Sequence, residues 1–400
     1  MHLLTAPQVA TGTRLLGPGW VLFDTAIREV GEGSPPARVL EAATATTALS
    51  EGVLAPGLVD IQVNGAFGVD FAAAAEDDWV AVATRLPSTG VTAFVPTLIT
   101  APVEELARGL RAYGSLKPRL EAVAGSARTL GVHLEGPFLS DKRRGAHRPG
   151  LLCDPDPAHI DALLDSSHGE LAYVTLAPER TGAIEAVKRL TTAGVRVAIG
   201  HSDADAATVR AAADAGATLV THLYNAQRPM HHRDPGTVGA ALTDPRLTCG
   251  LIVDLHHVAA LAVQVAFRAA SGGIALVTDA VAAMGMPDGT YELGGERLEV
   301  HPGQPPRRAD GTIAGSALRM DEAIANSVLH CSVDLLTAID AATRTPAAAL
   351  GRDDLGRIEP GAPADLVWLG EQYLAQVTWI AGQVAWEHEN ARAELQGHTS

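Results

Sequence analysis

GVHLEGPF, at residues 131–138, is the first of four stretches that decide the fold of this chain. The others are RVAIGHSD at 196–203, LVTHLYNA at 219–226 and ALVTDAVA at 275–282. Each is typical of a buried strand, and each ends on a side chain that can bind or serve a metal: Glu135, His201, His222 and Asp279. In a (β/α)8 barrel the chemistry lies at the C-terminal strand ends. Four such ends predict one shared site.

Eight apolar strand candidates lie between residues 58 and 279, which is the number that a closed barrel needs. Most are rich in Val, Ile and Leu, as expected for parallel strands covered on both faces. Helical patterns, such as those at 178–193, 203–215 and 258–270, alternate with them. This alternation predicts an α/β fold, a TIM-like (β/α)8 barrel. The candidates are Leu58–Val63, Thr92–Thr97, Thr129–Glu135, Leu171–Leu176, Val195–Gly200, Thr218–His222, Thr248–Asp254 and Ile274–Asp279.

The two ends of the chain have a different pattern. Gly17–Val30 and Asp365–Trp386 show β-like runs with turn residues and little helical period. We expect a small β-sandwich domain made of residues 1–55 and 357–400, and a barrel domain at 56–356. Within the latter, Thr290–Ile313 resembles a hairpin insertion, with turn-like residues at 309–312, and Met320–Leu350 is helical.

Composition limits the classes of partner. With 47% hydrophobic and 19% charged residues the 400-residue chain is an ordinary globular one, and its formal net charge of −16 argues against nucleic acid and anionic membranes. Three cysteines without a CxxC pair predict neither a thiolate zinc site nor a disulfide framework. No secretory leader or run of 18 apolar residues is recognisable, so we expect a cytoplasmic protein.

Glu135, His201 and His222 form a candidate metal site. Catalytic zinc prefers imidazole nitrogen and carboxylate oxygen and keeps one position open. The two histidines are 21 residues apart, one strand–helix–strand unit, which would put them at neighbouring strand ends. A structural role is the better interpretation of either His alone, but the set favours one divalent metal, most simply Zn, with Fe, Co or Mn also tolerated.

Asp279 is the candidate general base and acid. The alternative interpretation is that its side chain caps the N-terminus of a helix. The first strand carries Asp60, Gln62 and Asn64 on one face. Gln62 and Asn64 are poor zinc ligands, so we expect a single metal. Asp60 either ligates or orients its neighbours.

Several cationic and imidazole side chains follow the strands. His133 is typical of a satisfied interior histidine, whereas His147, in RRGAHRPG, is equally typical of a substrate contact and of a solvated loop. Lys142, Arg143 and Arg144 favour a solvated loop. Arg233 and His257 are better candidates for an anionic group.

Together the motifs resemble those of the amidohydrolase superfamily and, within it, of the N-acetylglucosamine-6-phosphate deacetylase family. The resemblance runs from about Pro56 to Ser316, through PGLVDIQVNG, GVHLEGPFLS with GAH after it, GHSDA, THLYNAQ, DLHH, LVTDA and IAGS. It implies a barrel with a small β-domain from both termini, a homodimer, and hydrolysis of the acetamide of N-acetylglucosamine 6-phosphate.

The resemblance also implies roles for single residues. Glu135, His201 and His222 would hold the metal, with Asp279 as acid and base. The QVN sequence of the first strand resembles the single-metal branch. Arg233 and His257 would contact the 6-phosphate. The sugar, its acetamide and the pocket wall would involve Ala146, His147, Asn225, Ala226, Ile313, Ala314, Gly315 and Ser316.

Two segments depart from the family pattern. Gln227 follows Asn225-Ala226 where relatives often have Met, ahead of an unusual RPMHHR loop, and VDLHHV replaces a more usual Asp-Gly-x-His. These put substrate breadth in question, so deacetylation of another N-acetyl amino sugar or its phosphate, such as N-acetylgalactosamine 6-phosphate, is the alternative. A non-catalytic sugar-phosphate sensor is disfavoured, because a binding protein needs no base beside a metal.

Overall fold

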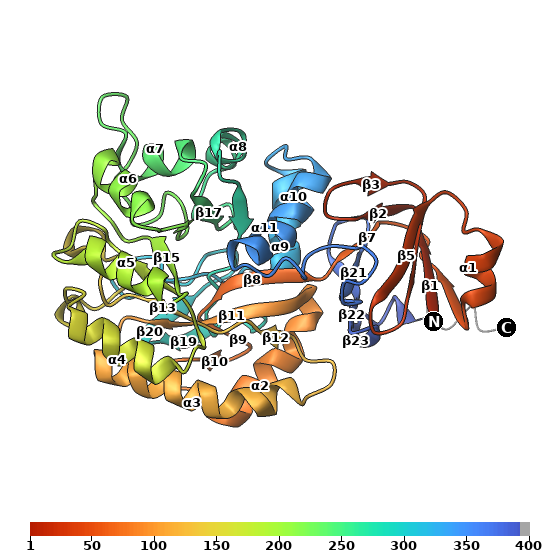
Figure 1. Cartoon of the computed structure of the whole chain (residues 1–400), viewed down its shortest axis with the longest axis horizontal. Coiled ribbons are helices and arrows are strands. Elements are labelled where there is room, and N and C mark those ends of the chain that lie inside the picture. The colour runs from red at the N-terminus through yellow and green to blue at the C-terminus, as the bar shows by residue number, and fades with distance from the viewer. Residues whose placement is uncertain (393–400) are drawn as a thin grey trace.

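Eight parallel strands form the centre of the molecule, which the computed structural model describes from residue 1 to residue 392 (Figure 1). Each pairs with the next along the chain. Beyond the last strand, the Asp279 amide donates to the Gln62 carbonyl over 3.0 Å, and Val63 bridges Ala280 in parallel. The strands thus make the predicted (β/α)8 barrel: β8 (Leu58–Val63), β11 (Val91–Ile99), β13 (Val132–Glu135), β14 (Leu171–Leu176), β15 (Arg196–Ile199), β16 (Leu219–Val220), β17 (Thr248–Leu251) and β18 (Ile274–Leu276).

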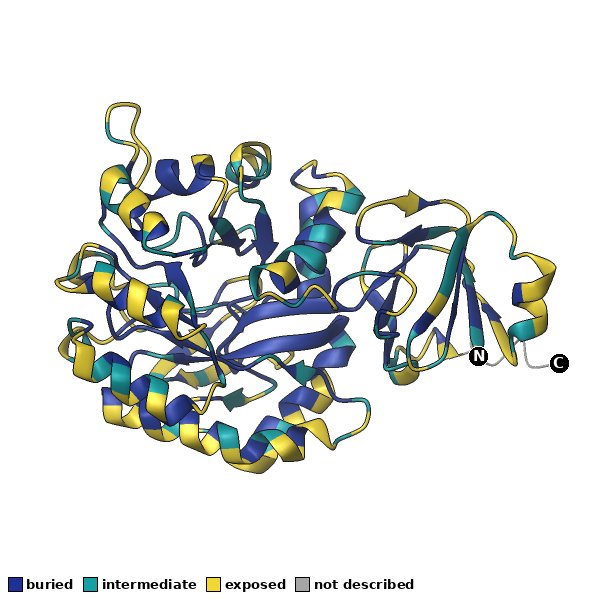
Figure 2. Cartoon of the chain, viewed as in Figure 1, coloured by how far each residue is buried: buried dark blue, intermediate teal, exposed yellow. Residues whose placement is uncertain are grey.

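Helices cover the outside of the barrel, with their exposed faces turned to solvent (Figure 2). The longest, α3, buries Leu106, Leu110, Tyr113 and Leu120 at helical spacing against the barrel. The helices over the barrel are α2 (Glu76–Arg85), α3 (Val103–Glu121), α4 (Pro157–Ser167), α5 (Ala183–Thr192), α6 (Ala206–Asp214), α7 (Gly236–Thr243), α8 (Ala260–Ala269), α9 (Met320–Leu329), α10 (Leu335–Ala341) and α11 (Arg344–Ala349). Short 3₁₀ turns are η1 (Leu86–Thr89), η2 (Asp141–Arg143) and η3 (Pro149–Leu151).

The termini build a separate β-structure beside the barrel (Figure 1). One sheet has the order β5-β4-β1-β6 and the other β23-β22-β21-β7-β2-β3, around their own core with Phe23, Leu54, Trp368 and Trp379. The two-domain division at 55/56 and 356/357 stays a prediction. The elements are β1 (His2–Ala6), β2 (Gln8–Ala10), β3 (Leu15–Leu16), β4 (Gly19–Phe23), β5 (Ile27–Glu32), α1 (Ala37–Ala42), β6 (Ala45–Ala48), β7 (Val53–Pro56), β21 (Leu366–Leu369), β22 (Ala375–Ile380) and β23 (Gln383–Glu387).

A hairpin follows the eighth barrel strand, as expected. β19 (Gly289–Leu293) pairs antiparallel with β20 (Glu296–Val300) through Gly294 and Gly295, at φ 57° and 78°. Two positive φ angles match the turn that two-residue hairpins favour, which explains why both residues are glycine. The residues at 309–312 also form a turn, as expected, in the return segment, where the Arg308 amide donates to the Thr312 carbonyl. Three short strands remain: β9 (Gly65–Ala66), β10 (Val69–Asp70) and β12 (Arg128–Thr129).

In the part of the chain that the structure describes, no helix has both the length and the apolar character needed to cross a membrane.

Candidate active site

Three of the four site residues at strand ends have backbones in the left-handed region. His201, His222 and Asp279 have φ angles of 46°, 27° and 51°. Non-glycine residues rarely adopt such angles, because each costs about 1–3 kcal/mol and persists only where the surrounding structure holds it. The segment before His201 leaves little room for adjustment, because a Cβ on Gly200 would lie 2.6 Å from Thr175 and 2.8 Å from Thr221. The strand ends therefore hold these side chains in fixed orientations.

Glu135, His201 and His222 meet in a buried triangle of ligand atoms. Oε1 of Glu135 lies 3.1 Å from Nε2 of His201 and 2.9 Å from Nε2 of His222, and the two nitrogens are 3.1 Å apart. Three atoms bound to one tetrahedral zinc ion at about 2.0–2.1 Å would lie about 3.3 Å apart. The triangle therefore fits a divalent metal ion.

The tautomer of His201 also fits a metal. Its Nδ1 lies 2.9 Å from the Arg143 carbonyl oxygen, which can only accept, so Nδ1 carries the proton and Nε2 keeps its lone pair. Burial raises the pKa of Glu135, but the adjacent His201 and His222 imidazoles outweigh it and hold that pKa well below the ordinary value. Nδ1 of His222 is buried without a partner among the described residues. The carboxylate thus stays ionised, as a metal ligand must.

Asp279 faces the same cavity with a different environment. Its Oδ1 accepts hydrogen bonds from Nε2 of Gln62 at 3.1 Å and Nδ2 of Asn64 at 2.7 Å. Burial, and then the charge of Glu135, raises the pKa of Asp279 to about 6. The described residues directly after Asp279 form a bridge and a turn, and no helix begins there, so the N-cap alternative is wrong. A carboxyl group with this pKa can both accept and return a proton near neutral pH.

Asp60 orients neighbours and is not part of the triangle. Its Oδ2 accepts a hydrogen bond from the Thr278 hydroxyl at 2.6 Å, and its Oδ1 accepts one from the backbone amide of Gln62 at 3.2 Å. Burial raises the pKa of Asp60 to about 7. His133 is likewise an interior side chain, with its ring nitrogens 3.0 Å from Thr97 Oγ1 and 2.8 Å from Thr175 Oγ1.

His147 lies inside the site and is not solvated. Its Nδ1 is 2.8 Å from Thr100 Oγ1, and its ring meets the His201 ring edge-on with centroids 4.4 Å apart. Burial, and then His201, lowers the pKa of His147 to about 3, so the imidazole is neutral. Glu135, His147 and His201 each offer a ligand atom within 4.8 Å of the others. We favour His222 as third ligand because its nitrogen lies within 3.1 Å of both other triangle atoms.

A cavity of about 350 Å³ lies in front of the triangle. Most of the residues singled out from the sequence line it: Asn64, Glu135, Ala146, His147, His201, His222, Asn225, Ala226, His257, Asp279, Ile313, Ala314 and Gly315. Lys142 and Arg143, expected in a solvated loop, line it too and pair with Asp203 at 3.2 and 2.8 Å. Sequence reasoning missed the apolar wall of Ile99, Ile252 and Leu293, which carries no motif.

Three expected residues lie outside this lining. Gln62 is behind Asp279, to which it donates. Ser316 is fully buried, and its hydroxyl donates to the Thr278 carbonyl over 2.6 Å, so it supports the wall from behind. Arg233 is exposed in the loop before α7, beside His232, and does not reach the cavity of its own chain.

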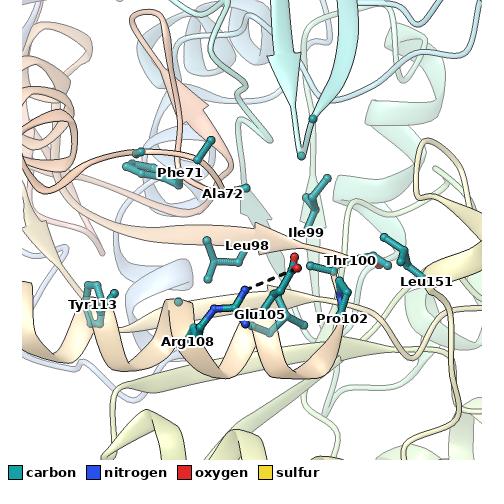
Figure 3. A pocket seen from close by; sticks show the side chains of 18 of the residues that line it. Phe71, Ala72, Leu98, Ile99, Thr100, Pro102, Glu105, Arg108, Tyr113 and Leu151 are labelled. Atoms are coloured by element: carbon teal, nitrogen blue, oxygen red, sulfur yellow. Dashed lines mark ion pairs between the residues drawn. The ribbon is translucent and has the colours of Figure 1, made fainter.

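A second cavity, of about 520 Å³, adjoins the first and shares Ile99 with it. Figure 3 shows Phe71, Leu98 and Tyr113 at one end and the Glu105–Arg108 ion pair, 3.6 Å long, on α3. The group of three potential metal ligands found among the described residues, Glu135, His147 and His201, lines the smaller cavity and not this one.

Comparison with known proteins agrees with this geometry. The model of the amidohydrolase family matches residues 53–385, and the chain belongs to that family. It is 39% identical over 355 residues to bovine N-acetylglucosamine-6-phosphate deacetylase, covering 85% of each chain. N-acetylgalactosamine-6-phosphate deacetylase of Escherichia coli O157:H7 is 40% identical over 334 residues, with 83% and 88% covered.

A solved structure shows the same fold. It is an aspartate-to-alanine mutant of N-acetyl-D-glucosamine-6-phosphate deacetylase from Mycobacterium smegmatis, in complex with N-acetyl-D-glucosamine-6-phosphate. It superposes with a TM-score of 0.88 at 38% identity, covering 96% of this chain and 99% of the other.

Proposed function

We propose that this chain hydrolyses the acetamide of N-acetyl-D-glucosamine 6-phosphate to D-glucosamine 6-phosphate and acetate, a step of amino-sugar catabolism. The observation that carries the proposal is the buried Glu135, His201 and His222 triangle facing Asp279 across one cavity. Relatives of this name at about 40% identity along most of the chain support the sugar. The N-acetylgalactosamine alternative is not favoured, because most of the similar relatives found carry the glucosamine name.

Glu135, His201 and His222 would hold one divalent ion, for which zinc is our proposal. When bound, such an ion polarises a carbonyl group and lowers the pKa of water towards about 7. Asp279 would take a proton from the attacking water and return it to the leaving nitrogen. Atoms balance, because water supplies the acetate oxygen and the amine proton.

His147 would contact the acetamide. Its Nδ1 lies 2.8 Å from the Thr100 hydroxyl oxygen, and that hydroxyl donates to the Glu135 carbonyl oxygen over 3.2 Å. These contacts hold the imidazole ring in the cavity wall, where His147 is one of the lining residues.

The 6-phosphate would meet His257, whose Nδ1 is held 2.7 Å from Asp254 Oδ2. We propose that Arg233 reaches the 6-phosphate from the other protomer of a homodimer. Its loop projects from the body ahead of α7 (Figure 1), and Met230 in that loop and Leu261 on α8 are 61% and 74% exposed. A cytoplasmic location belongs to the same proposal and is supported by three unpaired cysteines.

Acetate release by metal-analysed protein tests the function, with N-acetylglucosamine, its 6-phosphate and N-acetylgalactosamine 6-phosphate as substrates. We expect the glucosamine phosphate to give the highest kcat/KM. Arg233→Ala should lower kcat/KM about 10- to 100-fold for the phosphate, by loss of one or two charge-assisted hydrogen bonds, and leave the unphosphorylated sugar unchanged. Arg28→Ala, on an exposed position of β5 in the terminal β-structure and outside the cavity lining, is the control. No acetate from any of the three by metal-loaded protein would overturn the proposal.

The pH dependence of kcat/KM should report Asp279. The base works ionised, so activity is present above its pKa and falls about tenfold per pH unit below it. With the pKa of Asp279 raised to about 6 by burial, and a nearby cation pulling it down, the acidic limb should lie at or below about pH 6. Steady-state rates from pH 4.5 to 9 measure it; a limb centred above pH 7 would contradict this assignment.

A further inference from the structure

We propose that Gln62 and Asn64 are positioning residues that clamp Asp279 by a single oxygen, Oδ1, and leave Oδ2 free for proton transfer. This inference rests on the proposed function, in which Asp279 moves the proton. Both amides come from the end of β8, whereas Asp279 follows β18, the strand that closes the barrel beside it.

The contacts converge on one atom. Nδ2 of Asn64 donates to Oδ1 of Asp279 over 2.7 Å, and Nε2 of Gln62 donates to the same oxygen over 3.1 Å. Oδ2 of Asp279 accepts no hydrogen bond from any described residue. Two donors on one oxygen fix the rotation of the carboxylate about its Cβ–Cγ bond. The unbonded oxygen is therefore the one available to water and to the leaving nitrogen.

The backbone beneath the clamp is tied across the closure of the barrel. The Asn64 amide donates to the Ala280 carbonyl over 2.8 Å, and the Asp279 amide donates to the Gln62 carbonyl over 3.0 Å. One layer deeper, Asp60 accepts from the Thr278 hydroxyl. The donors and the acceptor thus sit on adjacent strand ends that cannot shift independently.

The orientation of the Asn64 amide argues for a role beyond stability. Its Oδ1 is buried with no hydrogen-bond partner among the described residues, which costs about 1–3 kcal/mol. Turning the amide over would set that oxygen against the Asp279 carboxylate and remove the 2.7 Å bond. The unpaired oxygen is the consequence of directing the nitrogen at Asp279, and unsatisfied buried groups of this kind are typical of functional sites.

Neutral donors suit this task better than a cation. A second metal ion at these positions would also orient Asp279, but its charge would depress proton affinity far more than two amides do. With amide donors alone the carboxylate is oriented and still basic enough to take a proton from water.

Gln62→Met and Asn64→Leu test the clamp, because each removes the amide and keeps a side chain of similar size. We expect each to lower kcat about 10- to 100-fold, as lost supporting hydrogen bonds do at metal sites, with KM within threefold and metal content unchanged. The double variant should lose less than the product of the two, since both amides hold one oxygen. Ile61→Val, on the opposite face of β8, should stay within twofold of wild type.

Crystal structures of the same variants supply a readout independent of turnover: Asp279 should be in one conformer in the wild type and rotated or split in the variants. Should Asn64→Leu not fold, Gln62→Met decides. An unchanged kcat with Asp279 unmoved, or a rise in KM alone, would overturn the clamp. A wild type that releases no acetate would instead overturn the proposed function and leave the crystallographic comparison to judge the clamp.

Discussion

Replacing Asp279 with Asn should reduce acetate release at least about 10³-fold, the largest effect expected of any single substitution. Asparagine keeps the shape of the side chain but cannot take a proton from water or return one to the leaving nitrogen, and general acid–base groups contribute about 10²–10⁴-fold. Because Asp279 lies outside the Glu135, His201 and His222 triangle, the variant should keep its metal. Steady-state kinetics with metal analysis measure both quantities.

Asp60→Asn is the matched control, since Asp60 is another buried carboxyl in the same corner of the barrel. Asp60 accepts hydrogen bonds from the Thr278 hydroxyl and from the backbone amide of Gln62, but it does not line the cavity. Its loss should cost less than about tenfold in kcat. Equal losses in the two variants, or wild-type turnover in Asp279→Asn, would contradict the assignment of the base.

Removal of the metal should abolish turnover, and adding Zn²⁺ should restore it. The free energy of unfolding should also fall, by about 2.7 kcal/mol if the ion had been present at one hundred times its Kd, since it binds the folded chain. His222→Gln should lose the ion, because it removes one corner of the triangle, whereas His147→Gln should retain it. Metal analysis after dialysis and chemical denaturation provide the measurements.

The opposite result for the two histidines would change the assigned set of metal ligands. If His147→Gln lost the ion and His222→Gln kept it, the alternative group of Glu135, His147 and His201 would be the ligand set. Restoration of full activity without any divalent ion would contradict a metal site altogether.

The barrel could be predicted because each parallel strand is an apolar run that ends on a polar side chain, and strand order follows chain order. The convergence of Glu135, His201 and His222 follows from that rule. Arg233 could not be placed, because a loop position depends on contacts outside the repeating unit. Ser316 was expected to line the pocket but is buried behind it, since the Ile313–Ser316 segment turns inward to pair with Ala280.

The clamp and the left-handed strand ends were beyond sequence reasoning for a related cause. The spacing of Gln62 and Asn64 shows that they share a face, but not that both amides reach one oxygen of Asp279. Likewise nothing in the letters HSD or THL signals a positive φ, because glycine, the usual marker, is absent from those positions.

The pairing of β7 with β21 has a consequence for how the chain is made. Val53–Pro56 forms an antiparallel ladder with Leu366–Leu369, so a strand synthesised before the barrel finds its partner only after the barrel is complete. Until the ribosome releases that partner, β7 exposes an unpaired edge of the kind that invites association with other chains. A strand synthesised after the barrel therefore protects one synthesised before it, and removal of β21 should favour aggregation of nascent chains over loss of barrel chemistry.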